Sequence, residues 1–86
     1  MYFVYILYSE KDKNLYVGCT SDVNERLKRH NSGQVLATKF RQPLVCIHTE
    51  KFDSKEEAFN RERFLKTLWS ARFKNKLKKN YLINKQ

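Results

Sequence analysis

The N-terminal part of the chain alternates between short apolar runs and a charged turn. Residues 2–8 are aromatic and β-branched, which predicts a strand. The charged residues 9–14 are typical of a hairpin loop, and Leu15 begins a partner strand. Gly18 is expected to end that strand, either as a bulge or because another group approaches the backbone closely. The pattern therefore predicts an antiparallel hairpin.

A helical period follows the hairpin. Ser21 or Asp22 can cap the start of a helix, because the residues from Asp22 have the spacing of a capping box. The helix is expected to run to about Ser32, where Gly33 suits the position after the C-terminus. Its inward stripe, with the spacing of one helix face, consists of Val23, Leu27 and His30.

The second half of the chain predicts a loop, a strand and two helices. Residues 34–43 show no period and are interpreted as a loop, and residues 44–48 predict a third strand. A second capping box at Ser54 opens a helix that extends to about residues 68–69, and a last helix covers about residues 70–81. The order ββαβαα predicts an α+β fold, with a small three-stranded antiparallel sheet covered by helices.

Length and composition agree with one folded domain. The 86 residues are 41% hydrophobic and 14% aromatic, which suffices for a compact core and argues against disorder. We expect a single domain over residues 1–86, with a core over about residues 2–70 and a basic helix over about residues 70–86.

The cysteines and the apolar runs narrow the class of protein. Cys19 and Cys46 form no CxxC or CxxH pattern, so a metal knuckle is not indicated. A disulfide between them stays open, although free thiols in a reducing cytoplasm are the favoured interpretation. No apolar run approaches the roughly 18 residues that a bilayer span requires, and no signal peptide is evident. The sequence therefore predicts a soluble cytoplasmic protein without a membrane partner.

Positive charge is concentrated towards the C-terminus. Residues 1–62 contain ten Lys/Arg and nine Asp/Glu, whereas residues 63–86 contain eight Lys/Arg and no acid. This asymmetry predicts a polyanionic partner, because neutralising phosphates releases counterions. A solvated basic tail is the plainer alternative. The candidate nucleic-acid contacts are Lys28, Arg29, Lys66, Arg72, Lys74, Lys76, Lys78 and Lys79.

Glu62 is an unexpected residue on the second helix. It lies in the middle of the expected inward stripe, which consists of Ala58, Leu65 and Trp69. A carboxylate that faces a core is unfavourable unless it meets a cation, hydrogen-bond donors or a metal. It could pair with a buried arginine or reach solvent at the edge of the core. Alternatively, it could bind a hard cation such as Mg²⁺, which keeps most of its waters and uses phosphate oxygens.

His30 is a similar anomaly on the first helix. A single inward histidine is often a hydrogen-bonded core residue, but here Arg26 lies one turn before it. Two potentially cationic groups on adjacent turns favour an anion beside them, and the planar guanidinium suits phosphate.

Tyr5 and Tyr16 supply candidate hydroxyl groups. Each alone is an ordinary strand aromatic, but strand alternation places Tyr5 on the opposite face from Tyr2. Tyr16 can reach the same face as Tyr5 from the neighbouring strand. A phenol, with a reference pKa near 10, is a poor base at neutral pH unless cations lower that value. Arg26 or a metal ion on Glu62 could supply such a field.

These residues, in this order, resemble a known motif series. The chain looks like a stand-alone bacterial GIY-YIG domain, similar to the nuclease domain at the N-terminus of the bacterial excinuclease. The resemblance spans about residues 2–70, and the segments that carry it are Phe3-Val4-Tyr5, Tyr16-Val17-Gly18, residues 26–30 and Glu62.

The resemblance implies a role for each residue of the series. Tyr16 would activate the attacking water, as general base or through metal-bound water, and Tyr5 would orient the water or the phosphate. Arg26 would clamp the scissile phosphate, and His30 would assist proton transfer with Tyr16. Glu62 would hold a single Mg²⁺ or Mn²⁺ ion that stabilises the departing 3′ oxygen.

Two positions depart from the family pattern. Phe3 replaces the first glycine of the GIY trio and leaves the tyrosine in place. Cys19 follows Gly18, where excinuclease-like members often carry a lysine. A charge that could activate Tyr16 is therefore missing at that position.

From this resemblance we expect a divalent-metal-dependent endonuclease that hydrolyses phosphodiester bonds in nucleic acid, DNA rather than RNA. Phosphate contacts position a protein without reading bases, so sequence preference should be small unless a partner protein supplies it. A nucleic-acid-binding module of the same fold, with little or no turnover, is the alternative, and a structural partner of RNA is a further one. Roles in repair, defence and mobile elements all stay open.

Overall fold

The computed structural model describes residues 1–85. Its antiparallel sheet has the strand order β2-β1-β3 and consists of β1 (Tyr2–Ser9), β2 (Leu15–Thr20) and β3 (Leu44–Phe52). The helices are α1 (Val23–Asn31), α2 (Lys55–Leu65) and α3 (Ala71–Lys85), with short 3₁₀ turns η1 (Leu36–Thr38) and η2 (Leu68–Ser70) in the connections. The predicted α+β class and the ββαβαα order are confirmed.

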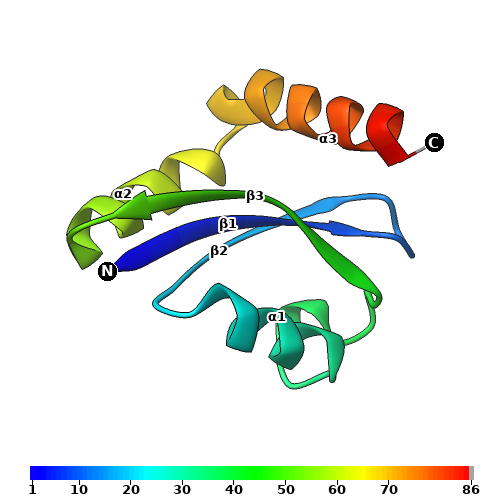
Figure 1. Cartoon of the computed structure of the whole chain (residues 1–86). Coiled ribbons are helices and arrows are strands. Elements are labelled where there is room, and N and C mark those ends of the chain that lie inside the picture. Colours follow the sequence, from blue (N-terminus) through cyan, green and yellow to red (C-terminus); the bar gives the residue numbers. More distant parts are fainter. Residues whose placement is uncertain (86) are drawn as a thin grey trace.

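The sheet is the middle layer of the fold, with α1 on one face and α2 and α3 on the other (Figure 1). Successive side chains of β1 alternate between the two faces, as strand geometry requires. Tyr5 and Leu7 pack with α1, whereas Val4 and Ile6 pack with α2 and α3. Because β1 is the central strand, all four side chains are buried and β1 contributes to both cores.

Side-chain caps determine where the first two helices begin. The carboxylate of Asp22 accepts a hydrogen bond from the backbone N–H of Glu25 at 3.0 Å, and the hydroxyl of Ser54 accepts one from Glu57 at 3.1 Å. Gly33 follows the end of α1 with a φ of +80°, a left-handed conformation that glycine adopts without strain. These three predicted boundaries are confirmed.

Four elements differ in length from the prediction. β2 continues to Thr20 and β3 continues to Phe52, because both strands keep pairing with β1. α2 ends at Leu65 rather than at residues 68–69, and α3 extends to Lys85. Pairing partners and turn contacts, which periodicity does not reveal, set these ends.

The early end of α2 overturns the predicted position of Trp69. The hydroxyl of Ser70 donates to the backbone carbonyl of Leu65 at 2.9 Å and closes a turn where the helix was expected to continue. Trp69 is therefore 88% exposed instead of lying on the inward stripe. Phe73 and Leu77 of α3 contact the core in its place.

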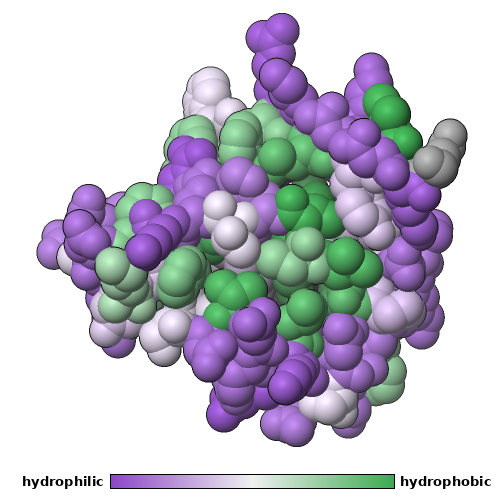
Figure 2. Space-filling view, viewed as in Figure 1, coloured by the Kyte–Doolittle hydropathy of each residue, from purple (hydrophilic) through white to green (hydrophobic). Residues whose placement is uncertain are grey.

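Apolar surface is unevenly distributed over the molecule. Figure 2 shows apolar side chains gathered in the middle of one face, with hydrophilic side chains around them. No helix within residues 1–85 is both long and apolar enough to cross a bilayer. The most exposed large apolar side chains in the connections and on α3 are Leu36, Phe40, Leu68, Trp69 and Ile83.

Gly18 makes room for a side chain from the neighbouring strand. It lies opposite Tyr5 in the β1–β2 pairing, and the Tyr5 ring covers its backbone. A Cβ atom at residue 18 would lie 2.3 Å from the Tyr5 hydroxyl oxygen and 2.4 Å from Cζ, closer than any real contact. The prediction that another group approaches the backbone at Gly18 is confirmed, and that group is a side chain of the same sheet.

We expect Gly18→Ala to destabilise the protein by about 1–3 kcal/mol, because the new methyl group displaces the Tyr5 ring. In a Tyr5→Leu background the same substitution should be nearly neutral or stabilising, since alanine is otherwise more favourable than glycine in a strand. Urea unfolding of the four proteins, treated as a double-mutant cycle, measures this coupling. Equal effects of Gly18→Ala in both backgrounds would contradict the packing of the ring on Gly18.

Candidate active site

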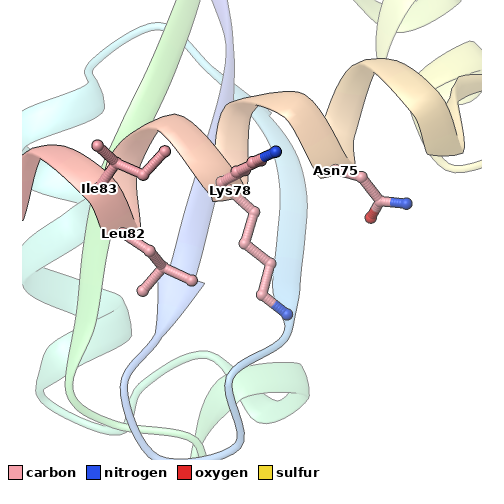
Figure 3. Close-up of a pocket in the computed structure, with 5 residues that line it drawn as sticks. Asn75, Lys78, Leu82 and Ile83 are labelled. Carbon is pink, nitrogen blue, oxygen red and sulfur yellow. The ribbon is translucent and has the colours of Figure 1, made fainter.

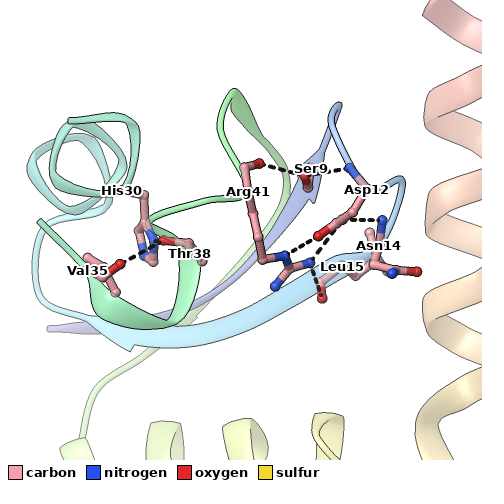
Figure 4. A network of polar contacts seen from close by, with 8 residues as sticks. All are labelled: Ser9, Asp12, Asn14, Leu15, His30, Val35, Thr38 and Arg41. Carbon is pink, nitrogen blue, oxygen red and sulfur yellow. Dashed lines mark hydrogen bonds and ion pairs between the residues drawn. The ribbon is translucent and has the colours of Figure 1, made fainter. Parts of the chain in front are cut away.

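A buried chain of hydrogen bonds connects β1, α1 and the η1 turn. The Tyr5 hydroxyl oxygen lies 2.9 Å from Nε2 of His30, and Nδ1 of His30 lies 2.6 Å from the Thr38 hydroxyl oxygen. The Thr38 hydroxyl is in turn 3.5 Å from the carbonyl oxygen of Val35 (Figure 4). Tyr5, His30 and Thr38 are at most 1% exposed. Segments that are distant in sequence therefore meet at one imidazole.

The apolar stripe of α1 brings His30 to this place. Val23 and Leu27 pack in the core that contains Tyr5, and His30 is the next position on the same helix face. The predicted inward stripe is confirmed. Since both ring nitrogens have partners, His30 is a satisfied core residue and at the same time part of a polar cluster.

Tyr16 completes an aromatic cluster around the imidazole. Its ring centroid lies 5.0 Å from that of His30 and 6.5 Å from that of Tyr5. Tyr16 is half-buried, unlike the other two residues. The family resemblance pairs His30 with Tyr16, but the structure bonds His30 to Tyr5 and packs it against Tyr16. The two tyrosines therefore occupy different positions relative to the histidine.

Arg26 carries a donor without a partner. Its Nε is buried and has no hydrogen-bond partner among residues 1–85. A buried unpaired donor is unfavourable, and an anion such as phosphate would satisfy it. The guanidinium also lies close enough to Tyr5 and His30 to influence the pKa of each. Arg26 thus belongs to the cluster and has a free donor for a ligand.

Burial keeps the Tyr5–His30 pair neutral. Desolvation, followed by the proximity of Tyr16, raises the pKa of Tyr5 to about 12, while the charge of Arg26 acts in the opposite direction. Burial, followed by the charge of Arg26, lowers the pKa of His30 below its usual 6.5. Contrary to the expectation, Arg26 does not bring the pKa of Tyr5 below its usual value. At neutral pH an uncharged phenol meets an uncharged imidazole.

Glu62 approaches the cluster from the other side of the sheet. It lies on α2, which packs on β1 and β2 opposite α1. Its side chain is 21% exposed and pairs with Lys66 at 3.1 Å. Burial and then the charge of Glu62 raise the pKa of Cys19, which places the carboxylate near the edge that β2 forms. Glu62 thus reaches solvent at the edge of the core and pairs with a partly exposed lysine rather than with a buried arginine.

Glu62 offers one carboxylate to a metal ion. Within residues 1–85 no three His, Cys, Asp or Glu side chains gather as metal ligands. A single, partly exposed carboxylate suits Mg²⁺, which keeps several waters and takes further oxygens from phosphate. The donor set therefore fits a hard divalent ion that binds together with a phosphate group, and does not fit an all-protein cage.

A second polar network holds the loop that carries Thr38. Nε of Arg41 lies 2.5 Å from Oδ2 of Asp12, and the Ser9 hydroxyl donates to the Arg41 carbonyl at 2.6 Å (Figure 4). Hydrogen bonding to Arg41 is the main cause that lowers the pKa of Asp12 to about 2. The network ties residues 34–43 to the hairpin and so holds Thr38 over α1.

Sequence reasoning missed Thr38. The residue lies in a stretch without periodicity, and a threonine in a loop satisfies its hydroxyl in many ways. Its partner His30 is eight residues away, across a change from helix to 3₁₀ turn. No local pattern in the sequence indicates that contact.

The predicted nucleic-acid contacts do not form one surface. Lys28 and Arg29 lie on α1, on one face of the sheet, whereas the cations of α3 lie on the other face (Figure 1). Arg29 pairs with Glu25 at 2.6 Å, and Lys66 pairs with Glu62. The predicted contacts on α3 are Arg72, Lys74, Lys76, Lys78 and Lys79.

An apolar strip interrupts the basic surface of α3. An open groove of about 270 Å³ runs along the helix (Figure 3). Two lysines, an asparagine and two apolar side chains line it, and these are Asn75, Lys78, Lys79, Leu82 and Ile83. The lysines therefore project beside apolar surface rather than forming a continuous cationic face.

Known proteins are similar to this chain in sequence. A family model described as the GIY-YIG catalytic domain matches residues 1–80. A UPF0213 protein of Natronomonas pharaonis is 40% identical over 72 residues, which cover 83% of this chain and 84% of that protein. A UPF0213 protein of Staphylococcus haemolyticus is 43% identical over 67 residues, which cover 77% of this chain and 80% of that protein.

A solved structure agrees with the fold. The solution NMR structure of a UPF0213 protein from Bacillus halodurans is 42% identical to this chain, with a TM-score of 0.54. The match covers 90% of this chain and 82% of that chain. The chain therefore belongs to the GIY-YIG catalytic domain family, and it is similar to the small stand-alone UPF0213 members of that family.

Proposed function

We propose that this protein is a divalent-metal-dependent endonuclease that hydrolyses phosphodiester bonds in nucleic acid, with DNA rather than RNA as its substrate. The family supports nuclease chemistry. The observation that carries the proposal is the buried, unpartnered Nε of Arg26 beside the Tyr5–His30 hydrogen bond. A cationic donor without an acceptor, next to a neutral proton-accepting pair, suits a phosphodiester and the water that attacks it.

Arg26 would bind the scissile phosphate. Its guanidinium presents several N–H donors in one plane, and Nε has no competing acceptor within residues 1–85. As negative charge grows on the phosphate oxygens in the transition state, donors that are already in place stabilise it without rearranging. Loss of these donors should therefore affect the rate more than the affinity for nucleic acid.

The Tyr5–His30 pair would take the proton of the attacking water. With the imidazole proton on Nδ1, His30 donates to Thr38, the Thr38 hydroxyl donates to Val35, and Nε2 accepts from Tyr5. The lone pairs of the Tyr5 oxygen can then accept a proton from water as its own proton moves to Nε2. A free phenolate, which the raised pKa of Tyr5 disfavours, is not required.

Tyr16 would position that water. Its ring packs against His30 and is more exposed than the ring of Tyr5. This assignment exchanges the roles that the family resemblance implies for the two tyrosines, because Tyr5 makes the hydrogen bond to His30.

Glu62 would hold Mg²⁺ or Mn²⁺, and an ion bound there supplies positive charge for the departing 3′ oxygen. The carboxylate is partly exposed, where a hydrated ion can reach it. Arg26 and Glu62 come from helices on opposite faces of the sheet. Glu62 and Arg26 both influence the pKa of Cys19 on β2, so the scissile phosphate would lie at the β2 edge.

Nucleic acid that crosses this edge would meet the basic residues of α1, whereas α3 packs against β3 at the other edge of the sheet. Such contacts hold phosphates and carry no sequence information, so we expect little intrinsic sequence preference. A partner protein in the cytoplasm would then supply the choice of target.

The wild-type protein should nick supercoiled plasmid DNA with Mg²⁺ or Mn²⁺, and EDTA should abolish the reaction. Arg26→Ala and Glu62→Ala should each lower the rate by roughly 100-fold or more, because each removes charge that acts on the transition state. DNA binding, measured by fluorescence anisotropy, should change by less than about threefold. Arg63→Ala and Glu56→Ala remove the same charges from exposed positions of α2 and serve as matched controls.

Two outcomes would contradict this function. A wild-type protein that binds DNA with steep salt dependence, but cuts no duplex, branched or single-stranded substrate, would be a binding module of the same fold. A clear preference for RNA in direct competition would point instead to an RNA partner.

Protonation of His30 should reduce both activity and stability. Its pKa is lowered in the folded state, so the unfolded state binds the proton at higher pH. The free energy of unfolding should then fall by up to about 1.4 kcal/mol per pH unit as the pH drops below about 6.5 towards the lowered pKa. Plasmid nicking should stay constant near pH 7 and decline through that same lowered pKa.

Chemical unfolding at a series of pH values tests this linkage. His30→Gln should remove the acid-side decline in stability that His30 causes, whereas His48→Gln, at the other histidine, should retain it. A His30→Gln protein with an unchanged pH dependence of stability would show that the imidazole is not held neutral by the fold.

Thr38→Val should lower kcat by roughly tenfold and leave DNA affinity unchanged, because the Nδ1 tautomer loses its acceptor. Thr38→Ser keeps the hydroxyl and should restore most of the rate. The pH at which activity declines should also move in Thr38→Val, as measured by kcat across the acid range. If the valine and serine variants had the same rate and pH profile, Thr38 would act only in packing.

A further inference from the structure

Two large apolar side chains on the connection between α2 and α3 are exposed to solvent. Leu68 is 92% exposed and Trp69 is 88% exposed, both within the η2 turn. Apolar surface of this size is normally removed from water when a protein folds. Neither residue takes part in the site at the β2 edge.

Hydrogen bonds hold the η2 turn, which carries Leu68 and Trp69, at both ends. The Ser70 hydroxyl donates to the carbonyls of Leu65 and Thr67, both at 2.9 Å, and Ser70 itself is 1% exposed. The Thr67 hydroxyl donates to the carbonyl of Phe64 at 2.6 Å. Since backbone and side-chain contacts hold both ends of η2, the two apolar side chains are displayed by the fold rather than left on a loose loop.

The surroundings of this turn are cationic. Lys66 precedes it and Arg72 follows it, and residues 63–86 contain eight Lys/Arg and no acid. Such a charge balance attracts a polyanion and repels cationic surfaces. An aromatic ring within a basic segment is the combination that binds a nucleic-acid strand through both its phosphates and its bases.

We propose that Leu68 and Trp69 form a stacking platform for an unpaired nucleic-acid base. The indole offers a flat apolar face on which any base can stack, and Leu68 beside it can wedge against the next base. In a perfect duplex the faces of the bases are covered by their neighbours, so the platform selects strands with unpaired or frayed bases. The inference rests on the proposed function, and it defines the substrate class as nucleic acid with a single-stranded segment.

Trp69 is the one tryptophan of the chain, so its fluorescence reports on the platform directly. In EDTA, where no cleavage occurs, a twelve-residue oligothymidylate should quench the emission on titration. A blunt duplex of the same length should quench it much less, and polyphosphate, which has charge but no bases, should not quench it.

Anisotropy of a labelled oligothymidylate then measures affinity in the variants. Trp69→Ala should weaken binding by roughly five- to 100-fold, the range expected for loss of one stacked base. Its salt dependence should be unchanged, because no charge is removed. Phe40→Ala, at an aromatic side chain that is 73% exposed elsewhere, should bind within about twofold of wild type and is the matched control.

Single-stranded affinity that is unchanged in Trp69→Ala would overturn the platform even if the protein cuts DNA. Quenching by polyphosphate as strong as that by oligothymidylate would also overturn it. An emission shift that depends on protein concentration rather than on oligothymidylate would overturn it as well, because Leu68 and Trp69 would then contact a second copy of the chain. An emission shift caused by anionic vesicles rather than by oligothymidylate would overturn it because the two side chains would then contact a membrane. Absence of cleavage with intact stacking would instead remove only the nuclease function.

Discussion

The site depends on one close approach between two neighbouring strands. The Tyr5 ring lies across the backbone of Gly18 and ends at Nε2 of His30. The Tyr5 ring can lie in this direction only because residue 18 lacks a side chain, since a Cβ atom there would overlap the ring. Its buried hydroxyl also needs a partner, because an unsatisfied buried hydroxyl costs about 1–3 kcal/mol. His30 meets this need, so packing and polar satisfaction select the same contact.

Burial of this contact determines its chemistry. Deep inside the sheet–helix interface, an ionised phenol or imidazole would lose its solvation, so the pKa of Tyr5 rises and that of His30 falls. The pair can exchange a proton without either partner carrying charge beforehand. Arg26 stands in contrast, because its charge stays and its Nε lacks an acceptor within residues 1–85. The cluster thus combines a neutral hydrogen-bonded pair with one cation whose Nε lacks an acceptor.

The sequence predicted those features that local spacing controls. Caps at Asp22 and Ser54, the turn at Gly33 and the inward position of His30 all depend on residues within one or two helical turns. It could not show which tyrosine bonds the histidine, because strand register and ring direction decide that. It also extended the periodicity of α2 to Trp69, whereas a hydroxyl contact beyond the helix ends it earlier.

Arg26 and Glu62 lie on helices that cover opposite faces of the sheet, and their position at one sheet edge relates them to each other. α1 and α2 cover opposite faces, and a flat sheet would keep their side chains apart. Only at an edge strand can groups from both faces reach the same ligand, and β2 is such a strand. Glu62 and Arg26 both influence the pKa of Cys19 on β2. In the proposed function, Arg26 from one face and Glu62 from the other would therefore serve one phosphate at this edge without either of them crossing the core.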